Sequence, residues 1–327
     1  MKKVLRILQF VIPVVLLAIV FSKIDFSKVA EVYVQSNKVL LFLAFVSFPL
    51  SYALFSLRWK LVLNMFGKRN ISYLRLLKIV YIGFFSGYFL PASVGIDIYR
   101  VYSLRKTDTT SVTIGLLFQE KLMGLLICGF FILFFSGILS INDQLVYPHI
   151  RTILYVFLSI SILVIALMLL FKNSRIVQLV LAFIERKLFD LIKWFALKFN
   201  KEVKVESGFL NKILQVSLYP KLILLVAAFS LINQFIGAVF SNIAFNALGA
   251  EIPLTYNLFA NPLLNILFLF PISFGGFGIR EGSYILIFGI LGVSSEISLL
   301  VSFVFLISTF INVGIGGILF MFNKKVL

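Results

Sequence analysis

The sequence predicts an all-α polytopic membrane protein. Of its 327 residues, 61% are hydrophobic and only 13% are charged, and the mean hydropathy is +1.07. A soluble domain typically has about 25% charged residues. Apolar runs recur from Val4 to Phe322, which leaves no polar stretch of the roughly 100 residues that a separate soluble domain needs. We therefore predict a single membrane domain over 1–327, without a soluble catalytic module.

Six of the apolar runs are long enough to cross a membrane, since a helix needs about 20 residues to span a hydrocarbon core of about 30 Å. The predicted spans are 4–22, 39–57, 112–139, 152–171, 222–248 and 297–322. The first follows Lys2, Lys3 and Arg6, as a signal peptide would, but no small-residue cleavage site follows it. We interpret it as a retained span.

The basic residues predict the direction of the spans. The chain has 30 Lys and Arg against 13 Asp and Glu, and most of the basic residues fall on one side if the N-terminus is cytoplasmic. The positive-inside rule then predicts a multi-pass protein of the plasma membrane with both termini in the cytoplasm. Because the basic residues occupy short loops between apolar runs, we do not expect nucleic-acid binding. The linker 172–221 alternates apolar and polar residues, and we expect a cytoplasmic amphipathic helix there.

Two further apolar segments, 79–99 and 257–293, are interrupted by Pro and Gly. Both flanks of 79–99 are basic, and the segment is too short for two crossings, so we predict a re-entrant hairpin from the cytoplasmic side. Segment 257–293 lies between Glu251 and Glu296 with no Lys or Arg at either edge. Its ends should lie outside, and both a second hairpin and two short crossings agree with that.

The two interrupted segments share one pattern, apolar-Pro-x-Ser-x-Gly-x-x-x-x-Arg, at 90–100 and 270–280. Each copy follows two predicted spans and precedes one. The halves 1–139 and 152–327 would therefore run in opposite directions through the membrane. An inverted repeat of this kind is typical of secondary transporters.

The shared pattern suits a helix break at membrane depth. Pro removes a backbone donor and Gly permits a positive φ, so a helix ends there and exposes backbone groups. Such backbone is tolerated in the membrane only where it is packed in protein or lines a wet cavity. The predicted break residues are Pro91, Ser93, Gly95, Pro271, Ser273, Gly275, Gly276 and Gly278. A plainer interpretation is that they only kink packed helices.

Charged residues near the breaks are candidates for a substrate path. Arg100 or Arg280 beside a helix N-terminus would bind an anionic group such as a lipid phosphate. A buried Arg280 needs a partner, and Glu281, Asp97 and Glu120 are the candidates. The predicted path residues are Arg280, Glu281, Arg100, Asp97, Glu120 and Lys121.

Two alternatives remain open for these charges. Arg100 could be an ordinary basic residue at the cytoplasmic interface, and Glu120 and Lys121 could extend to that interface from the start of span 112–139. Arg58-Trp59-Lys60 is most simply an interfacial aromatic residue with basic anchors.

No cofactor or metal is expected. Cys128 and His149 are the only Cys and His, which excludes a disulfide framework and a metal site built on several such ligands. The sequence also has no phosphate-binding loop, no H-E-x-x-H and no G-x-S-x-G. We therefore expect a protein that is not an enzyme.

The motifs together resemble the lysylphosphatidylglycerol synthase transmembrane-region family, the flippase-like membrane domain of multiple peptide resistance factors. The resembling pieces are Arg58-Trp59, the segment 90–100, Glu120-Lys121 and the segment 271–282, in which Pro-x-x-x-Gly-Gly-x-Gly-x-Arg-Glu is the most diagnostic. Lys121 departs from the usual Glu-Arg, which keeps the charge and loses the bidentate geometry.

The resemblance implies movement of a lipid between leaflets. Fused members of the family carry aminoacylated phosphatidylglycerol, and this chain lacks the synthase domain that makes it. We expect a flippase-like transporter of an anionic or amino-acid- or sugar-modified lipid, with membrane lipids bearing anionic head groups as partners. The alternative is a non-transporting membrane partner of a separate lipid- or glycan-modifying enzyme.

Overall fold

The computed structural model describes residues 21–22, 24–68, 70–88, 94–104, 110–141, 159, 216, 219–269 and 277–322. Every regular element in these ranges is an α-helix, and four helical stretches are long and apolar enough to cross a membrane: Lys38–Met65, Val112–Leu139, Pro220–Ala247 and Ser295–Met321. The prediction of an all-α membrane protein is confirmed. Nearly all of span 4–22, span 152–171 and most of the linker 172–221 lie outside the described residues, so the number of six spans stays a prediction.

The first half contains α2 (Phe26–Gln35), α3 (Lys38–Phe45), α4 (Ser47–Met65), α5 (Tyr73–Tyr88), α6 (Val94–Ser103) and α7 (Thr110–Ile141). Polar caps begin two of these helices: Asp25 accepts hydrogen bonds from backbone N–H groups at the start of α2, and Asn37 does so at the start of α3. The chain between α3 and α4 turns only at Val46, so the predicted span 39–57 continues to Met65. Its predicted end was about two turns too early.

The second half contains α11 (Pro220–Ala247), α12 (Leu254–Leu269), α13 (Ile279–Gly289) and α14 (Ser295–Met321). Pro220 occupies the first turn of α11, where its missing N–H costs no helical hydrogen bond. Gly278 begins α13 with a φ of +78°, a conformation that side chains with a Cβ rarely adopt. Gly278 therefore marks the end of the second predicted break, and its positive φ is the conformation that glycine permits.

Each predicted break lies between two helices that pack against each other. These helices are α5 and α6 in the first half and α12 and α13 in the second. Gly83 lets α5 approach α6, because a Cβ there would lie 3.0 Å from Cγ1 of Ile96. In the second pair, the Tyr256 hydroxyl donates to the carbonyl of Ile287. Gly95 lies in the first turn of α6. The other break residues, Pro91, Ser93, Pro271, Ser273, Gly275 and Gly276, lie outside the described residues.

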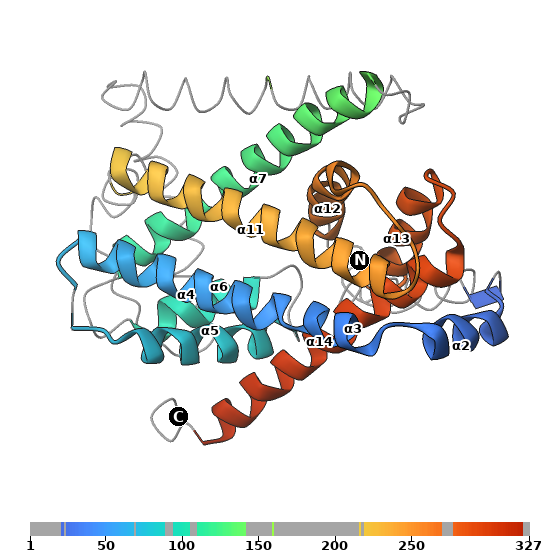
Figure 1. Ribbon diagram of the computed structural model, residues 1–327. Coiled ribbons are helices and arrows are strands. Elements are labelled where there is room, and N and C mark those ends of the chain that lie inside the picture. Colours follow the sequence, from blue (N-terminus) through green and yellow to red (C-terminus); the bar gives the residue numbers. More distant parts are fainter. Residues whose placement is uncertain are drawn as a thin grey trace, which may run out of the picture.

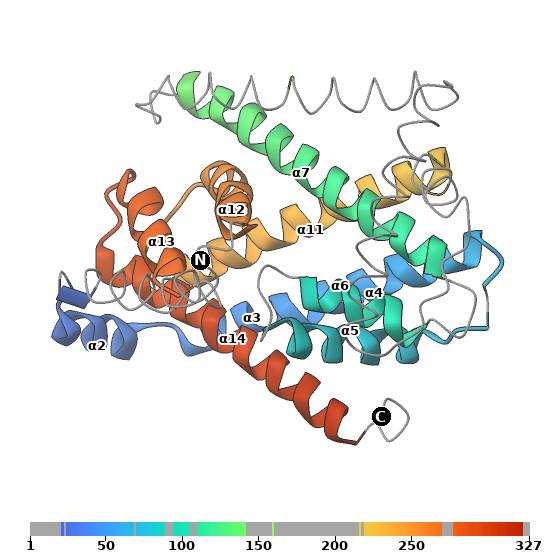
Figure 2. The same ribbon diagram turned by 180° about the vertical axis from the view of Figure 1, so that it is seen from behind.

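The last helix of each half packs on the helix that precedes the predicted break of the other half. In Figures 1 and 2, α7 crosses to α12, and α14 crosses to α5. Gly316 and Gly317 permit the second crossing, because a Cβ at Gly316 would collide with the Tyr81 carbonyl and one at Gly317 would lie 3.0 Å from the Phe85 ring.

Two further kinds of contact also occur in corresponding pairs. Helix α4 packs on α5 as α11 packs on α12, and α6 packs on α7 as α13 packs on α14. An inverted repeat is compatible with this correspondence, and the inverted repeat and the exact division of the chain stay predictions.

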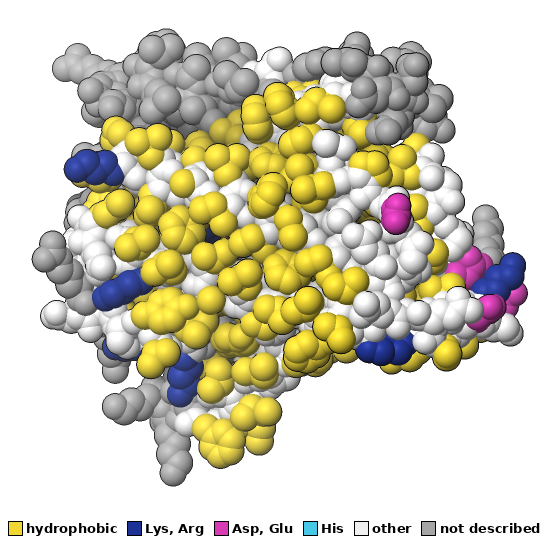
Figure 3. Space-filling model, in the orientation of Figure 1, with side chains coloured by type: hydrophobic (Ala, Val, Ile, Leu, Met, Phe, Trp, Pro, Cys, Tyr) yellow, Lys and Arg dark blue, Asp and Glu magenta, His cyan; other side chains and the backbone are white. Residues whose placement is uncertain are grey.

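The outer surface is strongly apolar. Figure 3 shows hydrophobic side chains over most of the visible described face, and Lys and Arg mainly toward its margins. Exposed residues on four different helices contribute, among them Phe42, Leu224, Leu286 and Ile311. An apolar face this broad is typical of a surface that contacts lipid.

Candidate functional site

A cavity of about 590 Å³ lies between the two halves of the protein. Helices α4, α5, α6 and α7 line it from the first half, and α11, α12, α13 and α14 line it from the second. The charged residues of its wall are Arg58, Asp97, Glu120, Lys121 and Arg280. Residues from separate parts of the sequence therefore meet at one cavity, including four of the six predicted path residues.

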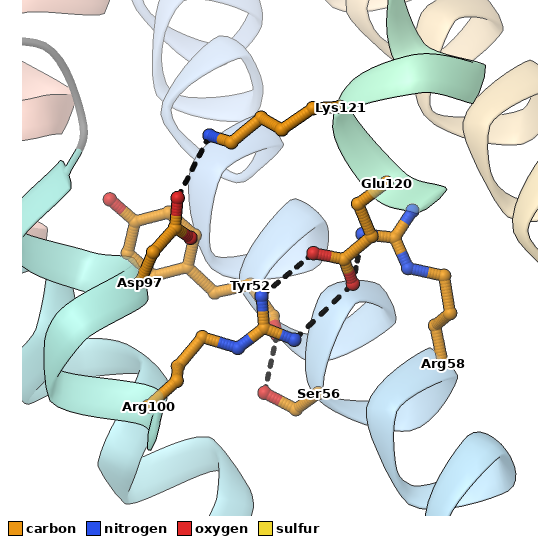
Figure 4. A network of polar contacts seen from close by, with 7 residues as sticks. All are labelled: Tyr52, Ser56, Arg58, Asp97, Arg100, Glu120 and Lys121. Atoms are coloured by element: carbon orange, nitrogen blue, oxygen red, sulfur yellow. Dashed lines mark hydrogen bonds and ion pairs between the residues drawn. The ribbon is translucent and has the colours of Figure 1, made fainter. Parts of the chain in front are cut away.

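Glu120 is the centre of the charged wall (Figure 4). Its carboxylate accepts two hydrogen bonds from the Arg100 guanidinium, at 2.7 and 3.2 Å, and lies 2.9 Å from Nη2 of Arg58. All three side chains are buried, and Arg100 has no exposed surface. Paired hydrogen bonds of this kind are among the strongest polar contacts in proteins. The triad joins α4, α6 and α7.

Aromatic rings lie against both arginines of the triad. The Phe55 ring centroid lies 4.9 Å from Cζ of Arg58 and 4.4 Å from Cζ of Arg100, and the Trp59 centroid lies 4.5 Å from Cζ of Arg100. Two guanidinium groups share a single carboxylate, which leaves an excess positive charge. The negative faces of the rings stabilise that charge.

The interpretation of Arg58 and Trp59 as interfacial anchors is wrong, because both side chains are buried. The apolar run ends near position 57, but α4 continues to Met65, so the two residues face α7 and α6 inside the protein. Arg100 and Glu120 do not extend to the protein surface either, because each side chain is buried in the triad. Arg100 pairs with Glu120 (Figure 4), and it is not among the described residues that line the cavity.

Asp97 and Lys121 form a second ion pair on the same wall, with 3.2 Å between the carboxylate and Nζ. Asp97 lies in the first turn of α6, where the helix dipole favours a negative charge. The pair is more open than the triad, since the side chains are 22% and 52% exposed. An exposed pair of this kind contributes little to stability.

The second half supplies Arg280, which lies on α13 and lines the cavity, with its Cζ 5.9 Å from the Phe268 ring centroid. Glu281 is fully buried and is not among the described lining residues. Its carboxylate accepts a hydrogen bond of 2.6 Å from the backbone N–H of Gly278 and so caps its own helix. The structure thus gives the two adjacent predicted residues different surroundings.

The sequence did not identify the uncharged polar residues of the wall. Asn233 and Gln234 on α11 and Asn261 and Asn265 on α12 all line the cavity. Asn265 donates to Oε1 of Gln234 at 3.1 Å, and Gln234 donates to the sulfur of Cys128 at 2.8 Å. A signal was present, because asparagines at 257, 261 and 265 follow a four-residue spacing that places them on one helix face.

The model of the lysylphosphatidylglycerol synthase TM region family matches residues 6–317, nearly the whole chain. The chain belongs to this family. The resemblance expected from the motifs is therefore confirmed, and with its apolar helices the chain is an integral membrane protein. No curated protein and no solved structure matches it.

In this member of the lysylphosphatidylglycerol synthase TM region family, the cavity wall carries more positive than negative charge. Arg58, Lys121 and Arg280 face Asp97 and Glu120, and Arg100, paired with Glu120, adds a further positive charge. A cavity wall with excess positive charge in an apolar membrane protein attracts an anionic group. The wall offers guanidinium and ammonium donors from both halves to such a group.

Proposed function

We propose that the protein is a flippase-type lipid transporter that moves lipids with anionic head groups between membrane leaflets. The observation that carries this proposal is the positively charged cavity, which helices of both halves enclose inside an apolar membrane protein. Family membership supports it, because the family is that of a membrane region associated with a lipid synthase.

The cavity would lower the barrier to lipid movement. Transfer of a charged head group into hydrocarbon has a high free-energy cost, and charged and polar residues on a cavity wall between two halves lower that cost. Since α7 packs on α12 and α14 packs on α5, a shift of one half would change the cavity wall. Opposed halves around one site are the arrangement by which many transporters alternate access.

We also propose that the protein moves lipid and is not itself an enzyme. A general base must reach a substrate proton, whereas Glu120 and Asp97 are held in ion pairs and Glu281 in a helix cap. The distribution of basic residues supports the plasma membrane with both termini cytoplasmic. The partners are membrane lipids.

The test is translocation by the native chain in proteoliposomes. With an acyl-chain-labelled phosphatidylglycerol in both leaflets, we expect an impermeant reductant to bleach the inner-leaflet label much faster than in protein-free vesicles. Bleaching limited to the outer leaflet would contradict the proposal. In that case, copurification with a lipid- or glycan-modifying enzyme would favour a non-transporting partner protein.

A further inference from the structure

We infer that the lipid head group taken by the cavity is rich in hydroxyl groups as well as anionic, as in glycerol, inositol or sugar phosphates, and is not an aminoacylated cation. This inference rests on the proposed function and names its substrate class. It is carried by the part of the cavity wall that the second half supplies, where four uncharged amides line the same cavity as the charged residues of the first half.

The two parts of the wall differ in chemistry. The first half contributes Arg58, Glu120, Asp97 and Lys121, which suit a phosphate. Helices α11 and α12 of the second half contribute four amides, which are Asn233, Gln234, Asn261 and Asn265. A carboxamide both donates and accepts hydrogen bonds, and so does a hydroxyl, so an amide wall is complementary to a polyol.

The amides retain hydrogen-bonding capacity toward the cavity. Asn261 donates to the Asn257 carbonyl at 3.0 Å, and Asn265 donates to Gln234. Within the described part of the chain, these contacts leave Oδ1 of Asn261 and Oδ1 of Asn265 without a hydrogen-bond donor, and the Asn233 amide makes no side-chain hydrogen bond at all. Asn233 and Asn265 are exposed and Asn261 is half-buried, so these amides are accessible to a ligand that donates and accepts hydrogen bonds.

In the described part of the chain, a cationic head group finds no unpaired carboxylate on the cavity wall. Glu120 already binds two guanidinium groups, and Asp97 is paired with Lys121. The remaining acid near the cavity, Glu281, caps its own helix. An aminoacylated head group would bring its ammonium toward Arg58, Lys121 and Arg280, and like charges repel.

The experiment compares four acyl-labelled lipids in proteoliposomes of the native chain. Phosphatidylmethanol is anionic without a head-group hydroxyl, phosphatidylglycerol and phosphatidylinositol are anionic with hydroxyls, and lysylphosphatidylglycerol is cationic. We expect the two hydroxylated anions to move about tenfold faster than phosphatidylmethanol, as two additional hydrogen bonds would give. Lysylphosphatidylglycerol should be the slowest. Equal rates for phosphatidylmethanol and phosphatidylinositol, or a fast cationic lipid, would overturn the inference.

A double variant localises the preference. Asn261→Leu with Asn265→Leu should bring phosphatidylinositol to within about twofold of phosphatidylmethanol, with both rates measured in the same variant. Asn246→Leu is the matched control, because this amide on α11 is exposed and bonds to Asn242 away from the cavity. A preference that survives in the double variant would overturn the assignment to the amide wall. The ranking by the native chain decides the inference even if the double variant does not fold.

Failure of the proposed function is distinguishable from failure of this inference. If the native chain moves no lipid, the transport proposal fails. Displacement of labelled phosphatidylglycerol from the detergent-solubilised protein by the same four head groups then decides the inference. Stronger displacement by phosphatidylinositol than by phosphatidylmethanol would uphold it, and equal displacement would overturn it.

Discussion

Arg280→Gln is expected to reduce lipid movement about 30- to 100-fold while the fold remains intact. Arg280 is the charged residue that the second half places on the cavity wall, together with the charged residues of the first half. A hydrogen bond to a charged group contributes about 1.5–3 kcal/mol, and its loss in the path of the head group raises the barrier by a similar amount. The rate in proteoliposomes and the thermal unfolding of the purified protein measure the two effects separately.

Two further substitutions control this result. Lys221→Gln removes the same charge from an exposed position at the start of α11, outside the cavity lining, and should leave the rate unchanged. Arg280→Lys keeps the charge without the planar guanidinium and should retain an intermediate rate. An equal loss in Lys221→Gln and Arg280→Gln would show that only overall charge matters. A native rate in Arg280→Gln would contradict the assigned path.

Glu120→Gln is expected to destabilise the protein by about 3–5 kcal/mol, because it leaves two buried guanidinium groups without their carboxylate. Unfolding of the purified protein by a denaturing detergent measures the change. Asp97→Asn is the matched comparison, since it removes a carboxylate from an ion pair on the same wall. That pair is partly exposed, so the cost should be below about 1 kcal/mol.

The double variant Glu120→Gln with Arg100→Gln separates the triad from a general effect of polarity. Its loss of unfolding free energy should be smaller than the sum of the losses in the two single variants. The reason is that the double variant removes both partners of one ion pair, whereas each single variant leaves one charged partner behind. If Glu120→Gln costs no more than Asp97→Asn, the triad is not the element that fixes α4, α6 and α7 together. The same conclusion would follow from strictly additive effects.

The sequence predicted an all-α membrane fold because a span is determined by the composition and length of one continuous apolar run. Spans near α7, α11 and α14 follow from those runs, and the repeated Pro and Gly pattern located both interrupted segments. The sequence could not show that α7 crosses to α12 and α14 to α5, since these contacts depend on packing between distant segments. The position of Gly316 against Tyr81 is visible only in the folded chain.

For the site, the sequence identified several charged residues but not how they pair. Glu120 was one of several candidate partners for Arg280, and it binds Arg100 and Arg58. Arg58 was misinterpreted because a basic residue next to Trp at the end of an apolar run is typical of an interface. The asparagines on α12 were missed because an uncharged amide indicates neither the direction of a span nor an ion pair.

The most direct test of the central claim, that lipid passes through this cavity, is a chemical block of the cavity. Asn233→Cys places a thiol on the wall, and Ile232→Cys places one on the neighbouring residue, which is 47% exposed and outside the lining. Each protein is labelled with a bulky maleimide in detergent and then reconstituted, with the native chain and its buried Cys128 as the blank. We expect the label to stop lipid movement at position 233 and to leave it unchanged at position 232. A fully labelled Asn233→Cys protein that moves lipid at the native rate would contradict a path through the cavity.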